Sequence, residues 1–205
     1  MIPTLVAAAT LLLTVLAGAP AAAHHTGVYT PKDNAITTNF KQLKFSVEAG
    51  KFDVARQLFD RGALRKEMRV RAVTLPPGLE ARLSGALFAG DAGEVEGALM
   101  AFFAALGRDL ALEADRQLAA GADPVSTGPR FLEAIWRYYN LVDFAVSRRD
   151  PRASVAMRLA YDDAETLVRP TTAPAAGSEP RLREAFRRIA DTLTGITQAP
   201  PAPVR

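Results

Sequence analysis

Apolar side chains recur at helical spacing through residues 131–168, which also hold the only tryptophan and three of the four tyrosines. Leu132, Trp136 and Tyr139 belong to the first half of this stretch, and a similar series follows the Asp150-Pro151 step. A spacing of three to four residues places such side chains on one face of a helix, and the proline interrupts the helix. The stretch therefore predicts a hairpin of two antiparallel helices.

The same spacing recurs after Asn34, Asp53 and Asp91, so the hairpin is one part of a larger helical domain. The 205 residues are 49% hydrophobic and contain no cysteine, which is enough apolar material for one core without disulfides. Alanine, leucine and arginine are frequent and runs of β-branched residues are few, which favours helices over strands. We predict an all-α protein, a single antiparallel helical bundle of about six to eight helices.

The first 23 residues carry no charged side chain, contain an apolar segment from Leu5 to Ala17 and end in small residues. These features are typical of a signal peptide that is cleaved after Ala23. The apolar segment is shorter than the ~20 residues that a transmembrane helix needs. We therefore expect an exported protein, periplasmic or extracellular, with no stable membrane span after cleavage.

Composition divides the rest of the chain into five segments. The segments are an extended N-terminal arm (24–33), the bundle (34–169), a Pro- and Ala-rich linker (170–180), an amphipathic helix (181–196) and a disordered tail (197–205). Within the bundle, a loop is expected at 121–130, which contains two prolines and two glycines, and Gly107 is expected to bend or break the helix before this loop.

The predicted cleavage makes His24 the mature amino terminus, followed by His25, and these are the only two histidines. A free α-amine next to an imidazole forms a chelate suited to Cu(II). The arrangement resembles the amino-terminal histidine chelates of copper-dependent polysaccharide monooxygenases and periplasmic copper carriers. This resemblance implies a copper site at His24 and His25, although those families use a further histidine that this chain lacks. The alternative is a polar chain start without a metal.

The predicted hairpin also carries most of the clustered carboxylates. Antiparallel pairing across Asp150-Pro151 places Asp143 near Arg158 and the carboxylates around residue 163 near Arg137. One interpretation is a set of interhelical ion pairs. The other is an iron or calcium site built from carboxylate oxygens. The candidate ligands of that site are Asp143, Asp162, Asp163 and Glu165.

Arginines concentrate between residues 61 and 82, where Arg61, Arg65 and Arg69 share one helix face. Arg65 and Arg69 are therefore candidates for binding an acidic partner, the alternative being a solvated helix face. The net charge is +3, and acidic residues are interspersed among the arginines. Nucleic-acid binding needs basic residues clustered on one face, so we expect none.

The chain also lacks the residue patterns of common catalytic sites. It has no cysteine nucleophile, no histidine beyond residue 25 and no Gly-rich phosphate loop. We therefore expect that this protein is not an enzyme. Two hypotheses remain: an exported, non-enzymatic binding or accessory protein for a metal ion or small ligand, or a structural module that docks onto an envelope protein without a bound ligand.

Overall fold

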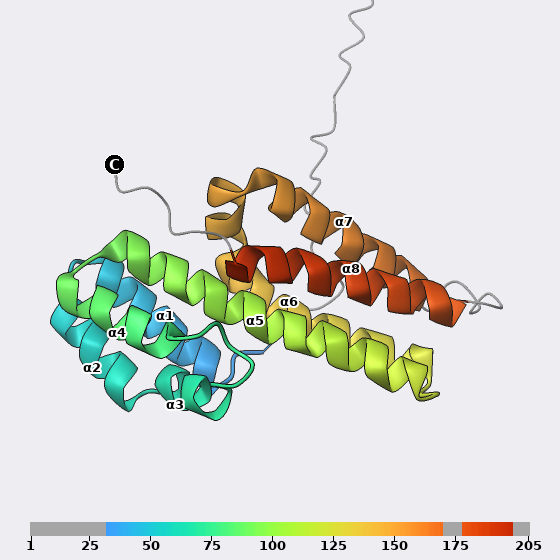
Figure 1. Ribbon diagram of the computed structural model, residues 1–205, viewed down its shortest axis with the longest axis horizontal. Helices are drawn as coiled ribbons and strands as arrows, with labels where there is room; N and C mark the ends of the chain where they lie inside the picture. The colour runs from blue at the N-terminus through green and yellow to red at the C-terminus, as the bar shows by residue number, and fades with distance from the viewer. Residues whose placement is uncertain (1–31, 170–177, 199–205) are drawn as a thin grey trace, which may run out of the picture.

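The computed structural model describes residues 32–169 and 178–198, and within these ranges the chain forms eight α-helices and no strand (Figure 1). This confirms the predicted all-α bundle. The signal peptide, His24, His25 and most of the predicted linker and tail lie outside the described residues. The helices are α1 (Ala35–Glu48), α2 (Phe52–Arg61), α3 (Ala63–Val70), α4 (Leu79–Ala89), α5 (Ala92–Ala119), α6 (Pro124–Arg149), α7 (Pro151–Val168) and α8 (Ser178–Gln198).

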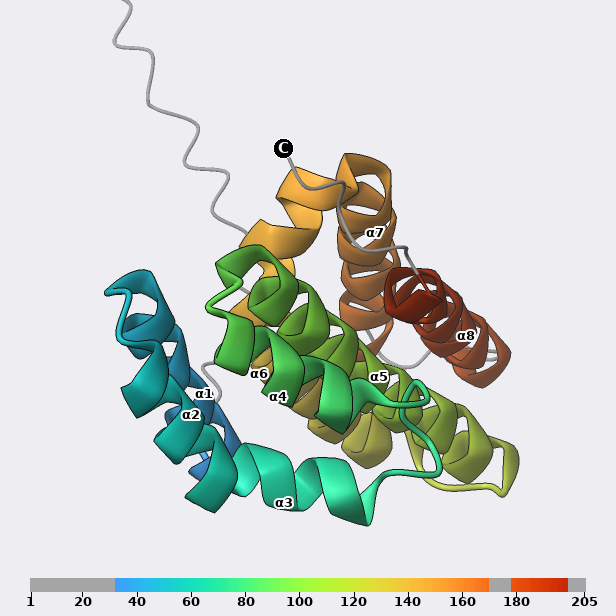
Figure 2. The same cartoon turned by 60° about the vertical axis from the view of Figure 1, so that its left-hand side comes forward.

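The long helix α5 joins two groups of helices (Figures 1 and 2). On one side α6, α7 and α8 complete a four-helix bundle with it, because α5 packs on α6 and α8, and α7 packs on both of these. On the other side α4 packs on α5, α2 packs on α4, and α1 packs on α2 and α3. No helix in the described part of the chain is both long and apolar enough to cross a membrane.

Helix α5 runs through Gly107 without a break, which was one of the two outcomes that the sequence predicts there. A Cβ atom at this position would lie 3.0 Å from Cδ1 of Leu193 on α8. The glycine therefore lets α8 approach α5 closely, and burial of both helix faces outweighs its low helix propensity. The prediction of a break at Gly107 was wrong.

Helix α6 begins at Pro124, inside the stretch 121–130 that we predicted to be a loop. Asp123 caps the helix by accepting hydrogen bonds from the next two free backbone N–H groups, at 3.2 and 3.1 Å. Proline at the first helical position is favourable because its missing N–H has no helical partner there. A Cβ on Gly128 would lie 2.4 Å from Cγ1 of Val168, so this glycine permits the contact with the end of α7.

The side chain of Asn39 joins α1 to the junction of α2 and α3. Its Nδ2 donates to the carbonyl oxygen of Leu58 at 3.0 Å, and its Oδ1 accepts from the backbone N–H of Leu64 at 3.0 Å. Gly62 precedes α3 and has no side chain to cap it, so Asn39 takes over that role from another helix. Asn39 is 7% exposed, and our sequence analysis did not single it out.

Helix α8 packs into the bundle and extends beyond both ends of the predicted helix 181–196. Its apolar stripe is buried, and Asp115 of α5 pairs with Arg183 at 2.8 Å and Arg187 at 3.1 Å. Burial opposes ionisation, but these two guanidinium groups hold the pKa of Asp115 below its usual value. Pro180 lies in the first turn, where proline is tolerated, so the helix starts within the predicted linker.

Candidate functional site

Asp143 forms the interhelical ion pair that the hairpin register predicts. Its Oδ2 lies 2.5 Å from a guanidinium nitrogen of Arg158 on α7, and the hydroxyl of Ser154 donates to its Oδ1 at 3.4 Å. Hydrogen bonding to Asp143 raises the pKa of Arg158. The carboxylate is therefore engaged in joining α6 to α7.

The other carboxylates of the hairpin have neighbours of their own. Asp163 pairs with Arg188 of α8 at 2.8 Å, whereas Glu165 is buried and pairs with Arg169 at 3.3 Å. Asp162 is half-buried and lies beside Asp163 on α7. Successive helical residues point about 100° apart, which directs these side chains toward different neighbours. Within residues 32–169 and 178–198, no three acidic or histidine side chains gather to hold a metal ion.

The two arginines proposed to bind an acidic partner form ion pairs within the chain. Arg65 lies 2.6 Å from Glu80 and 2.5 Å from Asp60, and Arg69 lies 3.1 Å from the same Glu80 oxygen. The hydrogen bond from Arg65 holds the pKa of Glu80 below its usual value, although burial opposes the shift. These contacts join α3 to α2 and α4, and they neutralise much of the charge that an acidic partner would meet.

The aromatic residues of the hairpin form a packed cluster. The ring of Trp136 lies 6.2 Å from that of Tyr139 and 5.1 Å from that of Tyr161, between ring centroids. The Tyr161 hydroxyl donates to the carbonyl oxygen of Leu132 at 3.0 Å. Tyr139 is fully buried, and burial together with the nearby Asp143 raises the pKa of its hydroxyl. This cluster stabilises the contact of α6 with α7.

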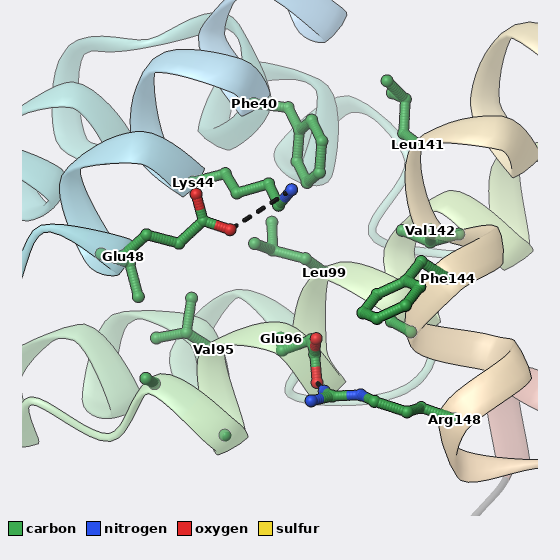
Figure 3. Close-up of a pocket in the computed structure, with 14 residues that line it drawn as sticks. Phe40, Lys44, Glu48, Val95, Glu96, Leu99, Leu141, Val142, Phe144 and Arg148 are labelled. Carbon is green, nitrogen blue, oxygen red and sulfur yellow. Dashed lines mark hydrogen bonds and ion pairs between the residues drawn. The ribbon is translucent and has the colours of Figure 1, made fainter.

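A groove of about 330 Å³ lies between α1, the first turns of α5 and the last turns of α6 (Figure 3). Its floor consists of buried side chains, and Phe144, which is 75% exposed, directs its ring into the opening. Such volume and lining are typical of pockets for small molecules. The apolar lining residues are Phe40, Val47, Val95, Leu99, Leu141, Val142, Phe144 and Ala145.

Two ion pairs lie at the rim of this groove. Lys44 and Glu48 of α1 are 3.3 Å apart, and Glu96 of α5 lies 2.5 Å from Arg148 of α6 (Figure 3). The Arg148 guanidinium also lies over the ring of Phe144, 5.6 Å from its centroid. Because each rim charge has an opposite charge beside it, the groove presents apolar walls between neutralised edges.

Sequence analysis did not find the groove, because its walls come from helices about a hundred residues apart in the chain. The helical spacing of apolar residues after Asn34 did predict the stripe of α1, which carries Phe40 and Val47. The residue in the sequence that could have indicated the groove is Phe144, because it is large and apolar but lies off the predicted apolar face of its own helix. An aromatic side chain at such a position marks a candidate contact outside the hairpin.

The structure defines this chain as an all-α bundle protein with an apolar groove on one side of its central helix. No protein-family model matches the chain, and neither a similar curated protein nor a similar solved structure was found.

Proposed function

We propose that this chain is an exported, non-enzymatic binding protein that holds a small, uncharged and mainly apolar molecule in the groove between α1, α5 and α6. The observation that carries this proposal is the groove itself, a cavity of about 330 Å³ with apolar walls and an open mouth. Monomeric proteins normally fill such space with side chains, so a preformed apolar pocket is a default binding-site hypothesis.

The charges at the rim support an uncharged ligand. Lys44 and Arg148 each have a carboxylate beside them, in Glu48 and Glu96. A charged ligand in the groove would lose hydration and would have to compete with an existing partner for either cation. An uncharged apolar molecule loses little by leaving water, and it gains contacts with the floor of the groove.

The size of the groove sets the expected affinity. A ligand that buries about 200 Å² of apolar surface gains about 5 kcal/mol at about 25 cal/mol per Å². This free energy corresponds to a Kd of about 0.2 mM, and the loss of translational and rotational freedom weakens it further. We expect a Kd of the order of 1 mM for a simple aromatic probe, and a tighter value for a natural ligand that fills the groove.

Export to the periplasm and the absence of catalysis are parts of the same proposal, and their support comes from the sequence. The first 23 residues have the pattern of a signal peptide, and the chain has neither cysteine nor any histidine beyond residue 25. Fractionation of an expressing bacterium and the intact mass of the recovered protein test export directly. Recovery of the uncleaved chain from the cytoplasm contradicts it.

Indole is a suitable probe for the groove, because it is small, uncharged and aromatic. When indole is titrated into the purified protein, we expect the amide chemical shifts of residues around the groove to change. The variant Ala145→Phe places a ring in the space that the ligand needs. The matched control Ala156→Phe adds the same side chain at an exposed position on α7.

Loss of indole binding in Ala145→Phe and its retention in Ala156→Phe support the groove as the binding site. No saturable shift in the unmodified protein up to about ten times the expected Kd contradicts the proposal. Equal binding by all three proteins also contradicts it, since the probe then binds elsewhere. Far-UV circular dichroism establishes that both variants are folded.

A further inference from the structure

Two arginine side chains from different helices meet over Gly97 of α5. Helices α4 and α6 both pack on α5, and they carry Arg82 and Arg149 respectively. A Cβ atom at Gly97 would lie 2.8 Å from Nη1 of Arg149 and 3.2 Å from Nη2 of Arg82. Both guanidinium groups therefore lie close to the same point on the surface of α5, and the missing side chain of the glycine makes room for them.

The guanidinium groups here outnumber the carboxylates that pair with them. Glu94 accepts a hydrogen bond from Nε of Arg82. Glu96 serves two arginines, since its Oε2 lies 2.5 Å from Arg148 and 3.3 Å from Arg149. Three arginines thus share two carboxylates, and this set of side chains keeps a positive charge at neutral pH.

The two side chains over Gly97 also have N–H groups without an acceptor in the described part of the chain. Arg82 donates only from Nε, which leaves both of its Nη atoms unused. Arg149 donates only from Nη2, to the carbonyl oxygen of Gly93 at 2.7 Å and to Glu96 at 3.3 Å, so its Nη1 is unused. The side chains of Arg82 and Arg149 are 30% and 16% exposed, so a solute can reach these donors.

A phosphate group suits this combination of charge and donors. Guanidinium N–H groups form short, charge-assisted hydrogen bonds with phosphate and carboxylate oxygens. A carboxylate is planar and pairs best with one guanidinium group. The oxygens of a phosphate point in several directions, so one phosphate can accept from two guanidinium groups that come from different helices. Its charge, about −1.5 to −2 near pH 7 for a monoester, offsets the positive charge of the cluster.

We propose that Arg82 and Arg149 form a binding site for a phosphate group over Gly97, for inorganic phosphate or for a small phosphomonoester. None of these three residues lines the groove between α1, α5 and α6, so the site is independent of the proposed function. Gly97 is a positioning residue, because a side chain at this place would displace both guanidinium groups.

Titration of the full chain with inorganic phosphate at constant ionic strength, near pH 7, tests the site. The side-chain N–H signals of the arginines and the amide signals around Gly97 report binding in NMR spectra. We expect saturation with a Kd of the order of 1 mM, because the two guanidinium groups supply charge-assisted hydrogen bonds at a partly exposed position.

Two variants remove the site in different ways. Arg82→Gln deletes one guanidinium group, and Gly97→Ala places a methyl group where the ends of both arginine side chains lie. Each is expected to raise the Kd for phosphate at least about tenfold. The control Arg116→Gln removes an exposed, ion-paired arginine near the other end of α5, so it changes the net charge equally. Far-UV circular dichroism establishes that all three variants are folded.

Weaker phosphate binding by Arg82→Gln and Gly97→Ala, with unchanged binding by Arg116→Gln, supports the site. The absence of saturable shifts in the unmodified chain up to about 20 mM phosphate overturns it. Equal affinity in all four proteins also overturns it, because the ion then responds only to overall charge, and so does a Gly97→Ala variant that binds as tightly as the unmodified chain. A parallel titration with phenyl phosphate distinguishes the two sources: tighter binding than that of inorganic phosphate assigns the site to phosphomonoesters, and weaker binding assigns it to the free ion.

Discussion

Replacement of Asn39 by alanine removes the side chain that holds α1 against α2 and α3. Both hydrogen bonds of the amide are 3.0 Å long, and both of their partners are backbone groups, the carbonyl of Leu58 and the N–H of Leu64. The alanine side chain can neither donate to the Leu58 carbonyl nor accept from the Leu64 N–H. Because α1 forms one wall of the groove, this contact connects the stability of the fold with the shape of the candidate site.

The expected loss of stability follows from these two bonds. A typical intramolecular hydrogen bond contributes about 1 kcal/mol, and a buried partner left unsatisfied costs about 1–3 kcal/mol. Loss of a helix cap alone costs about 1 kcal/mol. We expect Asn39→Ala to lower the free energy of unfolding by about 2–4 kcal/mol. For a domain of this size, that change lowers Tm by about 10 °C.

Urea denaturation followed by circular dichroism at 222 nm measures this loss. The control is Thr38→Ala, because Thr38 is the exposed neighbour on the same helix and should change stability by less than about 0.5 kcal/mol. A loss below about 1 kcal/mol for Asn39→Ala refutes the reasoning. So does a loss equal to that of the control, since the effect then belongs to helix propensity.

Three further predictions concern other parts of the chain. Gly128→Ala should destabilise the protein by about 1–3 kcal/mol because its Cβ meets a side chain of α7; the control Gly85→Ala, which meets nothing within 4 Å, should stabilise it by about 0.5–1 kcal/mol in thermal denaturation. The pKa of Asp115 is lower in the folded chain, so its ion pairs stabilise the protein above the unfolded pKa and lose this effect as pH falls. The stability difference between the unmodified chain and Asp115→Asn should therefore shrink between pH 7 and pH 3 in urea titrations, and a constant difference contradicts this assignment. If the signal peptide is cleaved after Ala23, the intact mass of the exported protein should equal that of a chain that begins at His24. Copper that this protein retains and that the His24→Ala variant loses supports the terminal chelate, whereas cleavage at another position excludes it.

Several local features followed from the sequence because they depend on neighbouring residues. The stripe of α1, the break at Asp150-Pro151 and the pairing of Asp143 with Arg158 all needed only helical periodicity and an antiparallel turn. The start of α6 did not follow, because the two glycines and two prolines of 121–130 predict a loop. Asp123 and Pro124 instead form a favourable helix start.

The candidate site depends on contacts that no local pattern specifies. Phe40 and Phe144 line the same groove because α6 packs on α5, and because Phe103 of α5 holds Phe40 of α1 in place through ring contact. The same holds for Asn39, whose partners lie nineteen and twenty-five positions away. The carboxylates of α7 are close in sequence, but the direction of each side chain assigns them to different neighbours.

The sequence by itself determined that this chain folds into helices and which face of most of them is buried, because both properties repeat every few residues. The tertiary structure decided which faces meet. In the folded chain Gly107 does not break its helix and allows close contact with Leu193, and an unfilled groove remains between α1, α5 and α6. The physical reason is that packing depends on the shapes of distant surfaces, whereas periodicity depends on the backbone alone.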